Sequence, residues 1–278
     1  MPDDVAYDSF IRAVKRLIGV DLTSYRQEQL RRRLESLMVR LGAKDFGEYG
    51  RLLERDPARL QEFRDYFTIN VTEFFRDTDR FRHLQTKVLP ELLRASPNLS
   101  VWSAACSNGA EPYSVAMQLK ELAPRGRHRI LATDVDRTIL AHARAGAGYG
   151  KLELQRTDKT MISRYFTTTD GTNYTVNPDV RKMVEFREHN LLSPAPGQGF
   201  DLILCRNVVI YFTNDAKAEL YGRLVGALRP GGVLFVGGTE IISAAQQLGI
   251  TASGPSFYTR GKSAAAPERR LAGAGARG

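Results

Sequence analysis

Apolar positions along the first part of the chain recur at the spacing of a helix. One stripe stands out, and it consists of Leu30, Leu34, Leu37, Met38 and Leu41. Steps of three and four residues place these side chains on one face of a helix, where they can be buried together. Gly42 follows directly and is a residue type that commonly ends a helix. The pattern predicts an N-terminal helical domain and linker over residues 1–90.

From about residue 99, short apolar strands alternate with helical segments. The predicted strands are Ser100–Ala104, Arg129–Thr133, Phe200–Leu204 and Gly231–Gly237. The predicted helices are Glu111–Leu122, Ile139–Ala145 and Asp215–Leu228. Strands that alternate with helices favour right-handed βαβ units and a mostly parallel sheet. We therefore predict an α/β domain over residues 91–261.

One segment departs from this alternation. Residues 163–189 contain RYFTTT, the turn pair Asp170-Gly171, NYTVN and then MVEFR. Because β-branched and aromatic residues around an Asp-Gly turn are typical of an antiparallel hairpin, we predict a small antiparallel β-subdomain inserted into the α/β domain. Residues 262–278 are rich in Ala, Gly and Arg and offer almost nothing to bury, which predicts a disordered basic tail.

Composition narrows the class of protein. Of the 278 residues, 42% are hydrophobic and 26% charged, fractions typical of a globular protein and unlike those of collagen, coiled coils or wholly disordered chains. No apolar run approaches the ~18 residues of a membrane span, and the N-terminal residues lack the apolar core of a signal peptide. Two cysteines cannot build a disulfide framework. We expect a cytoplasmic, monomeric protein without membrane insertion.

Charge adds an ambiguous signal. The formal net charge of +9 is compatible with binding to a nucleic acid, an anionic membrane or an acidic protein. It is equally compatible with a charge that serves solubility alone. Part of this charge lies in the predicted tail, whereas residues 1–90 are nearly balanced. A local cluster lies off the apolar stripe of the first predicted helix, and it consists of Arg31, Arg32, Arg33 and Arg40. These side chains form either a solvated face or a docking surface for an acidic partner.

Candidate chemistry begins in the loop between the first predicted strand and its helix. The residues of this loop, Ala104–Glu111, are small and follow a strand end, where open α/β sheets bind ligands. Gly109 is the loop's only glycine and no Lys-Ser/Thr follows, which disfavours a diphosphate cradle. Asp134 ends the second strand, where a carboxylate can accept hydrogen bonds from a ribose diol or cap the strand end. The combination fits a nucleoside cofactor without a diphosphate, such as S-adenosylmethionine.

Longer motifs lie along the same region. They are Asn70–Asp77 (NVTEFFRD), Trp102–Ser114 (WSAACSNGAEPYS), Asn190–Leu192 (NLL), Cys205–Phe212 (CRNVVIYF) and Leu228–Gly232 (LRPGG). Together they resemble the motifs of the chemotaxis receptor methyltransferases, the CheR family. The resemblance implies a Rossmann-like class I methyltransferase sheet with an N-terminal helical domain and a small inserted antiparallel β-subdomain. It also implies methyl transfer from S-adenosylmethionine to glutamate side chains on the cytoplasmic helices of chemoreceptors.

The resemblance further implies a role for each motif residue. Those that reach the cofactor from the linker are Asn70, Thr72 and Arg76. Those that hold the methionine part and the ribose are Glu111 and Asp134. Those on the adenine and loop side are Asn190, Leu191, Arg206 and Asn207. Tyr211 is implied to lie close to the transferred methyl group, together with Arg76.

Two stretches depart from the family pattern. The common G-C-S-T-G-E-E-P is here A-C-S-N-G-A-E-P, so Ala105 and Ala110 stand where Gly and Glu are common. Ala105 is still small, and it preserves a close approach to the backbone unless the position needs a positive φ. Around Gly238, Thr239 and Glu240 the family often shows G-H-S-E, and no role is carried over to this turn.

Methyl transfer to a glutamate needs orientation rather than a general base, because this carboxyl group has an ordinary pKa near ~4.3 and is ionised at neutral pH. Arg76 suits a positioning role, since a guanidinium can fork onto a carboxylate with fixed geometry. Tyr211 offers a hydroxyl that can steer the acceptor. Structural alternatives stay open: Arg76 as a surface arginine, Tyr211 as a core tyrosine and Glu111 as an ordinary first-turn acid.

Other chemistry is not indicated. Cys106 and Cys205 have no His/Asp relay in sequence reach, so we expect small buried hydrophobes rather than nucleophiles. The four histidines show no spacing typical of metal ligands, and we predict no metal.

Two rival functions remain. A nucleic-acid methyltransferase would suit the charge, but the chain has no Asp/Asn-Pro-Pro-Tyr motif and no basic stripe interleaved with aromatics, so we expect no nucleic-acid partner. The second rival is a cofactor-binding scaffold without turnover. The predicted hairpin, Thr167–Val176, is short compared with those that grip a receptor's C-terminal tether in some family members. We therefore expect receptor engagement without a tether peptide.

Overall fold

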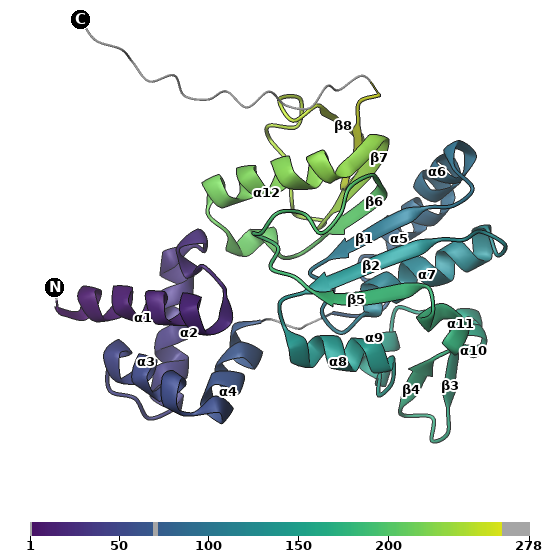
Figure 1. Cartoon of the computed structure of the whole chain (residues 1–278). Coiled ribbons are helices and arrows are strands. Elements are labelled where there is room, and N and C mark those ends of the chain that lie inside the picture. Colours follow the sequence, from purple (N-terminus) through teal and green to yellow (C-terminus); the bar gives the residue numbers. More distant parts are fainter. Residues whose placement is uncertain (1, 69–71, 263–278) are drawn as a thin grey trace, which may run out of the picture.

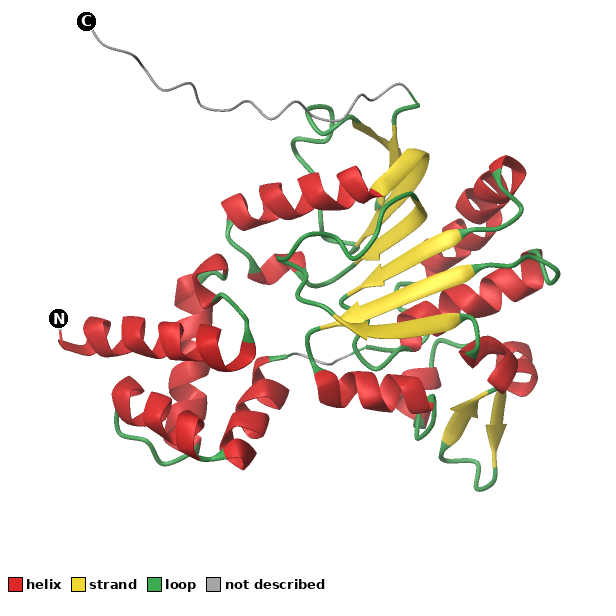
Figure 2. Cartoon of the chain, viewed as in Figure 1, coloured by secondary structure: helices red, strands yellow, loops and turns green. Residues whose placement is uncertain are grey.

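A computed structural model describes residues 2–68 and 72–262 of the chain. It consists of a helical domain beside an α/β domain built on a seven-stranded sheet (Figures 1 and 2). The predicted fold class is therefore confirmed. The predicted basic tail lies outside the described residues from 263 onward, and so does Asn70.

The helical domain is a bundle of short elements joined by tight, capped turns. Its helices are α1 (Pro2–Ile18), η1 (Leu22–Ser24), α2 (Gln27–Arg40), α3 (Phe46–Arg55) and α4 (Pro57–Phe67). Asp45 begins α3 by accepting a hydrogen bond from the Glu48 N–H, and Asp56 begins α4 in the same way, with Pro57 in the first position. The apolar stripe of α2 is buried, as its spacing predicts, against α1, α3 and α4.

The main sheet has the strand order β5-β2-β1-β6-β7-β9-β8. Its strands are β1 (Ser100–Ala104), β2 (Arg129–Asp134), β5 (Val184–Glu188), β6 (Phe200–Cys205), β7 (Leu228–Val236), β8 (Ile250–Gly254) and β9 (Phe257–Arg260). The first five of this order are parallel, and β9 pairs antiparallel with both β7 and β8. Strands β1 and β6 are neighbours from which the chain winds in opposite directions, so the topological switch point lies between them.

Both faces of the sheet are covered, which explains why its strands read as nearly continuous apolar runs. Val101, Leu202 and Val233 face the helices α5 (Thr78–His83), η2 (Leu84–Val88), α6 (Leu89–Ala95) and α7 (Ala110–Leu122). Trp102 and Ile203 face α12 (Asn214–Ala227), which lies on the opposite side (Figure 1). Helices α5, η2 and α6 thus pack on one face of the sheet and belong to the α/β domain. The sequence prediction places residues up to 90 in the helical domain and its linker.

The predicted inserted unit is smaller than residues 163–189. Its antiparallel pair is β3 (Phe166–Thr168) with β4 (Tyr174–Val176), flanked by α8 (Arg137–Ala145), α9 (Lys151–Leu154), α10 (Lys159–Tyr165) and α11 (Pro178–Arg181). Val184–Glu188 does not join this pair. It runs parallel to β2 as the edge strand of the main sheet, because its alternating apolar residues pack against α8 and α7.

Candidate active site

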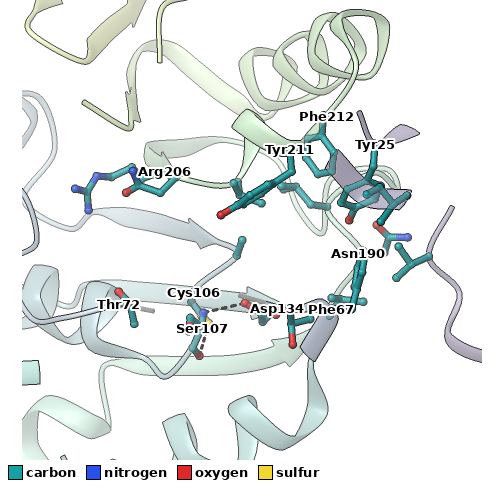
Figure 3. A pocket seen from close by; sticks show the side chains of 18 of the residues that line it. Tyr25, Phe67, Thr72, Cys106, Ser107, Asp134, Asn190, Arg206, Tyr211 and Phe212 are labelled. Carbon is teal, nitrogen blue, oxygen red and sulfur yellow. Dashed lines mark hydrogen bonds between the residues drawn. The ribbon is translucent and has the colours of Figure 1, made fainter. Parts of the chain in front are cut away.

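A cavity of about 450 Å³ lies between the helical domain and the carboxyl ends of β1, β2 and β6 (Figure 3). Its lining includes every predicted site residue that the structure describes, namely Thr72, Arg76, Glu111, Asp134, Asn190, Leu191, Arg206, Asn207 and Tyr211. The fold thus brings motifs that are far apart in the sequence to one place. Which part of a cofactor each residue contacts stays a prediction.

Strained backbone is concentrated around this cavity. Six described non-glycine residues have a positive φ, and five belong to its loops: Phe75, Asp77, Ala105, Ser107 and Asn207. Ala105 has a φ of 61°. The family's glycine adopts that conformation freely, whereas for alanine it costs about 1–2 kcal/mol. Strain of this kind persists where the surrounding structure holds a functional geometry.

Asp134 is a buried carboxylate at the end of β2. Its Oδ2 accepts a hydrogen bond from the Ser107 N–H at 2.8 Å (Figure 3), and its Oδ1 accepts one from the Asp136 N–H at 3.1 Å. Burial raises the pKa of Asp134, and these N–H groups oppose the shift. The residue therefore does cap backbone at the strand end. It also lines the cavity, so the two interpretations of Asp134 are compatible.

Arg206 is the centre of a buried ionic network. Its side chain is 2% exposed, and its guanidinium reaches Glu111 Oε2 at 3.0 Å and Asp77 Oδ2 at 2.7 Å. It also donates to the Arg76 carbonyl at 2.9 Å and lies over the ring of Phe235. Two charge-assisted hydrogen bonds from the planar guanidinium to two separate carboxylates fix its orientation as well as its charge. Arg206 therefore connects the end of β6 to α7 and to the segment that carries Arg76.

Glu111 is not an ordinary exposed first-turn acid. Its Oε1 accepts the hydroxyl of Ser103 at 2.7 Å, and its other oxygen is held by Arg206. The carboxylate is therefore fixed at the start of α7, where it lines the cavity.

Tyr211 lies in η3 (Val209–Tyr211), and its side chain points into the cavity (Figure 3). Its carbonyl accepts a hydrogen bond from the Arg26 N–H at 2.9 Å, and the Thr213 N–H donates to the Ser24 carbonyl at 2.8 Å. The segment of residues 211–213 is thus bound to residues 24–26 of the helical domain by a short antiparallel bridge. Tyr211 is therefore not a core tyrosine.

Sequence reasoning missed an aromatic wall of the cavity. Tyr25 and Phe67 come from the helical domain, and Tyr25 packs edge-on against Phe67 at 5.2 Å and Phe212 at 4.9 Å between ring centroids. Burial and the charge of Asp134 raise the pKa of Tyr25. No local signal marks Tyr25, because its partner Phe212 is remote in the sequence.

The arginines of the predicted cluster have different surroundings. Arg40 pairs with Glu62 at 3.0 Å within the helical domain, whereas Arg33 lines the cavity and also donates to the Tyr66 carbonyl at 2.7 Å. Arg31 pairs with Asp4 and Glu35. Arg32 is 74% exposed, makes only a surface pair with Glu28, and lines the cavity. Among the four, Arg32 is therefore the side chain best placed at the mouth.

The cysteines behave as the sequence predicts. Cys106 and Cys205 are buried free thiols, and burial raises the pKa of both. No group of three or more His, Cys, Asp or Glu side chains in the described part of the chain could hold a metal ion. Across residues 2–68 and 72–262, none of the helices has the length and apolar character needed to cross a membrane.

Comparison with known proteins decides the family. Residues 70–257 match the model of the CheR methyltransferase SAM-binding domain, and residues 6–68 match that of the CheR methyltransferase all-alpha domain. The chain belongs to the CheR methyltransferase family. It is 40% identical to a chemotaxis protein methyltransferase of Listeria innocua over 91% of this chain and 97% of that protein. A relative in Escherichia coli is 35% identical over 92% of each chain.

The residues present fit the cofactor that this family uses. S-adenosylmethionine carries an ammonium group and a ribose diol, and the cavity holds two fixed carboxylates, Glu111 and Asp134. Its loops of small residues allow a ligand to approach the backbone, and its volume lies in the range of small-molecule sites. This CheR-family protein is an S-adenosylmethionine-dependent methyltransferase.

Proposed function

We propose that this methyltransferase esterifies glutamate side chains on the cytoplasmic helices of chemoreceptors. The observation that carries the proposal is the convergence of Arg76 and Tyr211 in the cavity that also holds Glu111 and Asp134. It is supported by the names of the relatives, which are chemotaxis protein methyltransferases from Listeria innocua, Pseudomonas aeruginosa and Escherichia coli. We place the protein in the cytoplasm as a monomer.

The chain's own residues supply orientation in this reaction. When bound, the cofactor supplies a methyl group that a carboxylate oxygen takes as the carbon–sulfur bond breaks with its electron pair on sulfur, yielding a glutamate methyl ester and S-adenosylhomocysteine. Arg76 positions a carboxylate near the reacting centre, and Tyr211 steers the acceptor from the opposite loop. No side chain has to remove a proton, because the acceptor is already anionic.

The acceptor is an acidic helix in this proposal, and the mouth of the cavity suits it. Arg26 and Arg32 lie beside the mouth at the start of α2, where they attract carboxylates and raise the encounter rate. The inserted β3–β4 pair has only three residues in each strand, and we propose that it binds no tether peptide. A titration with receptor C-terminal peptides that gave micromolar affinity would contradict this part.

Labelled S-adenosylmethionine and receptor cytoplasmic fragments test the proposal. We expect alkali-labile label on the fragment, with no label when Arg76 is replaced by Ala. Binding of the cofactor without transfer would support the scaffold alternative instead. Label on nucleic acid, together with salt-sensitive binding, would support the other rival.

A further inference from the structure

A further buried acid lies near the loop that carries Tyr211, and the family resemblance implies no role for it. Glu240 is 6% exposed and follows β7. Its Oε2 accepts a hydrogen bond from the Gly237 N–H at 2.6 Å. A Cβ at Gly237 would lie 2.8 Å from that oxygen and 3.0 Å from the Asn207 backbone nitrogen. Gly237 is therefore packed closely against both the carboxylate and the backbone at the start of the Tyr211 loop.

The surroundings of Glu240 point toward this loop. Burial raises its pKa, while the backbone N–H groups of Gly237, Asn207 and Val209 and the charge of Arg206 oppose the shift. Its Oε1 has no partner within hydrogen-bond geometry in the described chain, so the Asn207 and Val209 N–H groups lie near the carboxylate without completing a regular hydrogen bond to this oxygen. A buried acid with one unsatisfied oxygen costs stability, so stability alone does not explain its presence.

The loop needs such an anchor between its two fixed ends. At its start, the Arg206 side chain is held by Glu111 and Asp77. At its end, the Tyr211 carbonyl is held by the Arg26 N–H. Between them Asn207 has a φ of 58°, a left-handed conformation that asparagine tolerates better than most residues and that reverses the chain direction at this point.

We propose that Glu240 is a positioning residue that holds the backbone of residues 206–211 so that Tyr211 faces the cavity. The negative charge of Glu240 attracts the backbone N–H groups of the loop and the Arg206 guanidinium. Glu240 affects the reaction only through the position of Tyr211. The proposal rests on the function proposed above for Tyr211.

Glu240→Gln tests the proposal, because it keeps the side chain's shape and removes its charge. We expect hydrogen exchange of the peptide 206–212 to accelerate several-fold, and kcat to fall about tenfold while the Kd for S-adenosylmethionine changes less than about twofold. The Glu240→Gln/Tyr211→Phe double variant should be no slower than Tyr211→Phe alone, because residues that act as a unit are not additive.

Asp201→Asn is the matched control. Asp201 is likewise buried and accepts the Ser100 N–H at 2.7 Å, but it lies at the opposite end of the sheet. The Asp201→Asn variant should have a lower melting temperature, while hydrogen exchange of residues 206–212 should be unchanged.

Glu240→Asp keeps the charge and should restore part of the protection of residues 206–212 against hydrogen exchange. Unchanged loop exchange in Glu240→Gln, or additive losses in the double variant, would overturn the proposal. Hydrogen exchange is measured without a methyl acceptor. It therefore tests the positioning role of Glu240 even if the proposed methylation of glutamate is wrong.

Discussion

The two walls of the cavity are built in different ways. The wall on the sheet side consists of strand-end loops with left-handed residues and the buried network of Arg206, Glu111 and Asp77. The wall on the helical side includes the aromatic rings of Tyr25 and Phe67, and it meets the sheet through a short backbone bridge and ring contacts. Buried ion networks lose stability as a unit when one member is removed. We therefore expect the sheet side to fix the chemistry and the helical side to control how tightly the cavity closes.

Arg206→Met should produce the largest effect, because it leaves Glu111 and Asp77 as buried or half-buried acids without their partner. We expect the free energy of unfolding to fall by about 3–5 kcal/mol and methyl transfer to be lost. Urea denaturation and label transfer measure the two effects. Arg229→Met is the control, since Arg229 pairs with Asp201 at the far end of β6 and its loss should spare kcat. Equal kcat losses in both variants would contradict the assigned role of Arg206.

Tyr25→Ala tests the helical wall. Removal of a partly buried ring should cost about 1–2 kcal/mol of unfolding free energy, less than a fully buried aromatic. We expect the affinity for S-adenosylmethionine to fall several-fold, measured by calorimetry, because one wall of the cavity is lost. Tyr25→Phe keeps the contacts with Phe67 and Phe212 and should bind nearly normally. Wild-type affinity in Tyr25→Ala would show that the helical side does not close the cavity.

Asp134 gives the sheet side a pH signature. Its pKa is raised in the folded state, so its contribution to stability is fully present below the unfolded value of 3.8 and is lost as pH rises through the folded value. Asp134→Asn lacks this dependence. The unfolding free energy of the wild type relative to the variant should therefore decline as pH rises above about 4. A constant difference across this range would contradict the raised pKa.

Ala105→Gly should relieve strain in the loop after β1. Glycine adopts a φ of 61° freely, so we expect a gain of about 0.5–1 kcal/mol in unfolding free energy after the entropy that glycine loses on folding. Thermal denaturation measures it. Ala104→Gly, one residue earlier in β1, should destabilise instead, since no left-handed conformation is recorded there. Destabilisation by both substitutions would argue against strain at Ala105.

The smallest change in stability is expected on the helical side. Arg32→Glu removes only a surface pair and should alter the unfolding free energy by less than about 0.5 kcal/mol. It should nevertheless slow receptor methylation several-fold at low salt, because it repels an acidic acceptor helix. Arg94→Glu, at a similarly exposed arginine of α6, is the control. An equal methylation rate in the two variants would leave the charge of Arg32 without a role in docking.

The sequence predicts the sheet side far better than the helical side. Spacing predicts Asp134 and the family resemblance implies Glu111; both line the cavity, and their contacts with a cofactor stay predictions. Local pattern predicts β1, β2, β6, β7 and the helix after Gly109, because each lies within a short continuous motif, but it misses β8 and β9. It did not place Val184–Glu188 in the main sheet, since an alternating segment next to a hairpin can pair on either side.

The remaining features depend on contacts between distant residues. Tyr25 lines the cavity only because Phe212 packs on it, and Arg206 joins Glu111 to Asp77 only after the sheet has formed. The positive φ of Ala105 is likewise a property of the folded loop. None of these has a periodic or compositional signal.

Mass spectrometry of a receptor cytoplasmic fragment, after incubation with the protein and S-adenosylmethionine, tests the central claim most directly. We expect one added methyl group on each modified glutamate, removed by mild alkali, formed more slowly with Tyr211→Phe and absent with Arg76→Ala. Methylation that resists alkali, or that falls on a side chain other than glutamate, would contradict it.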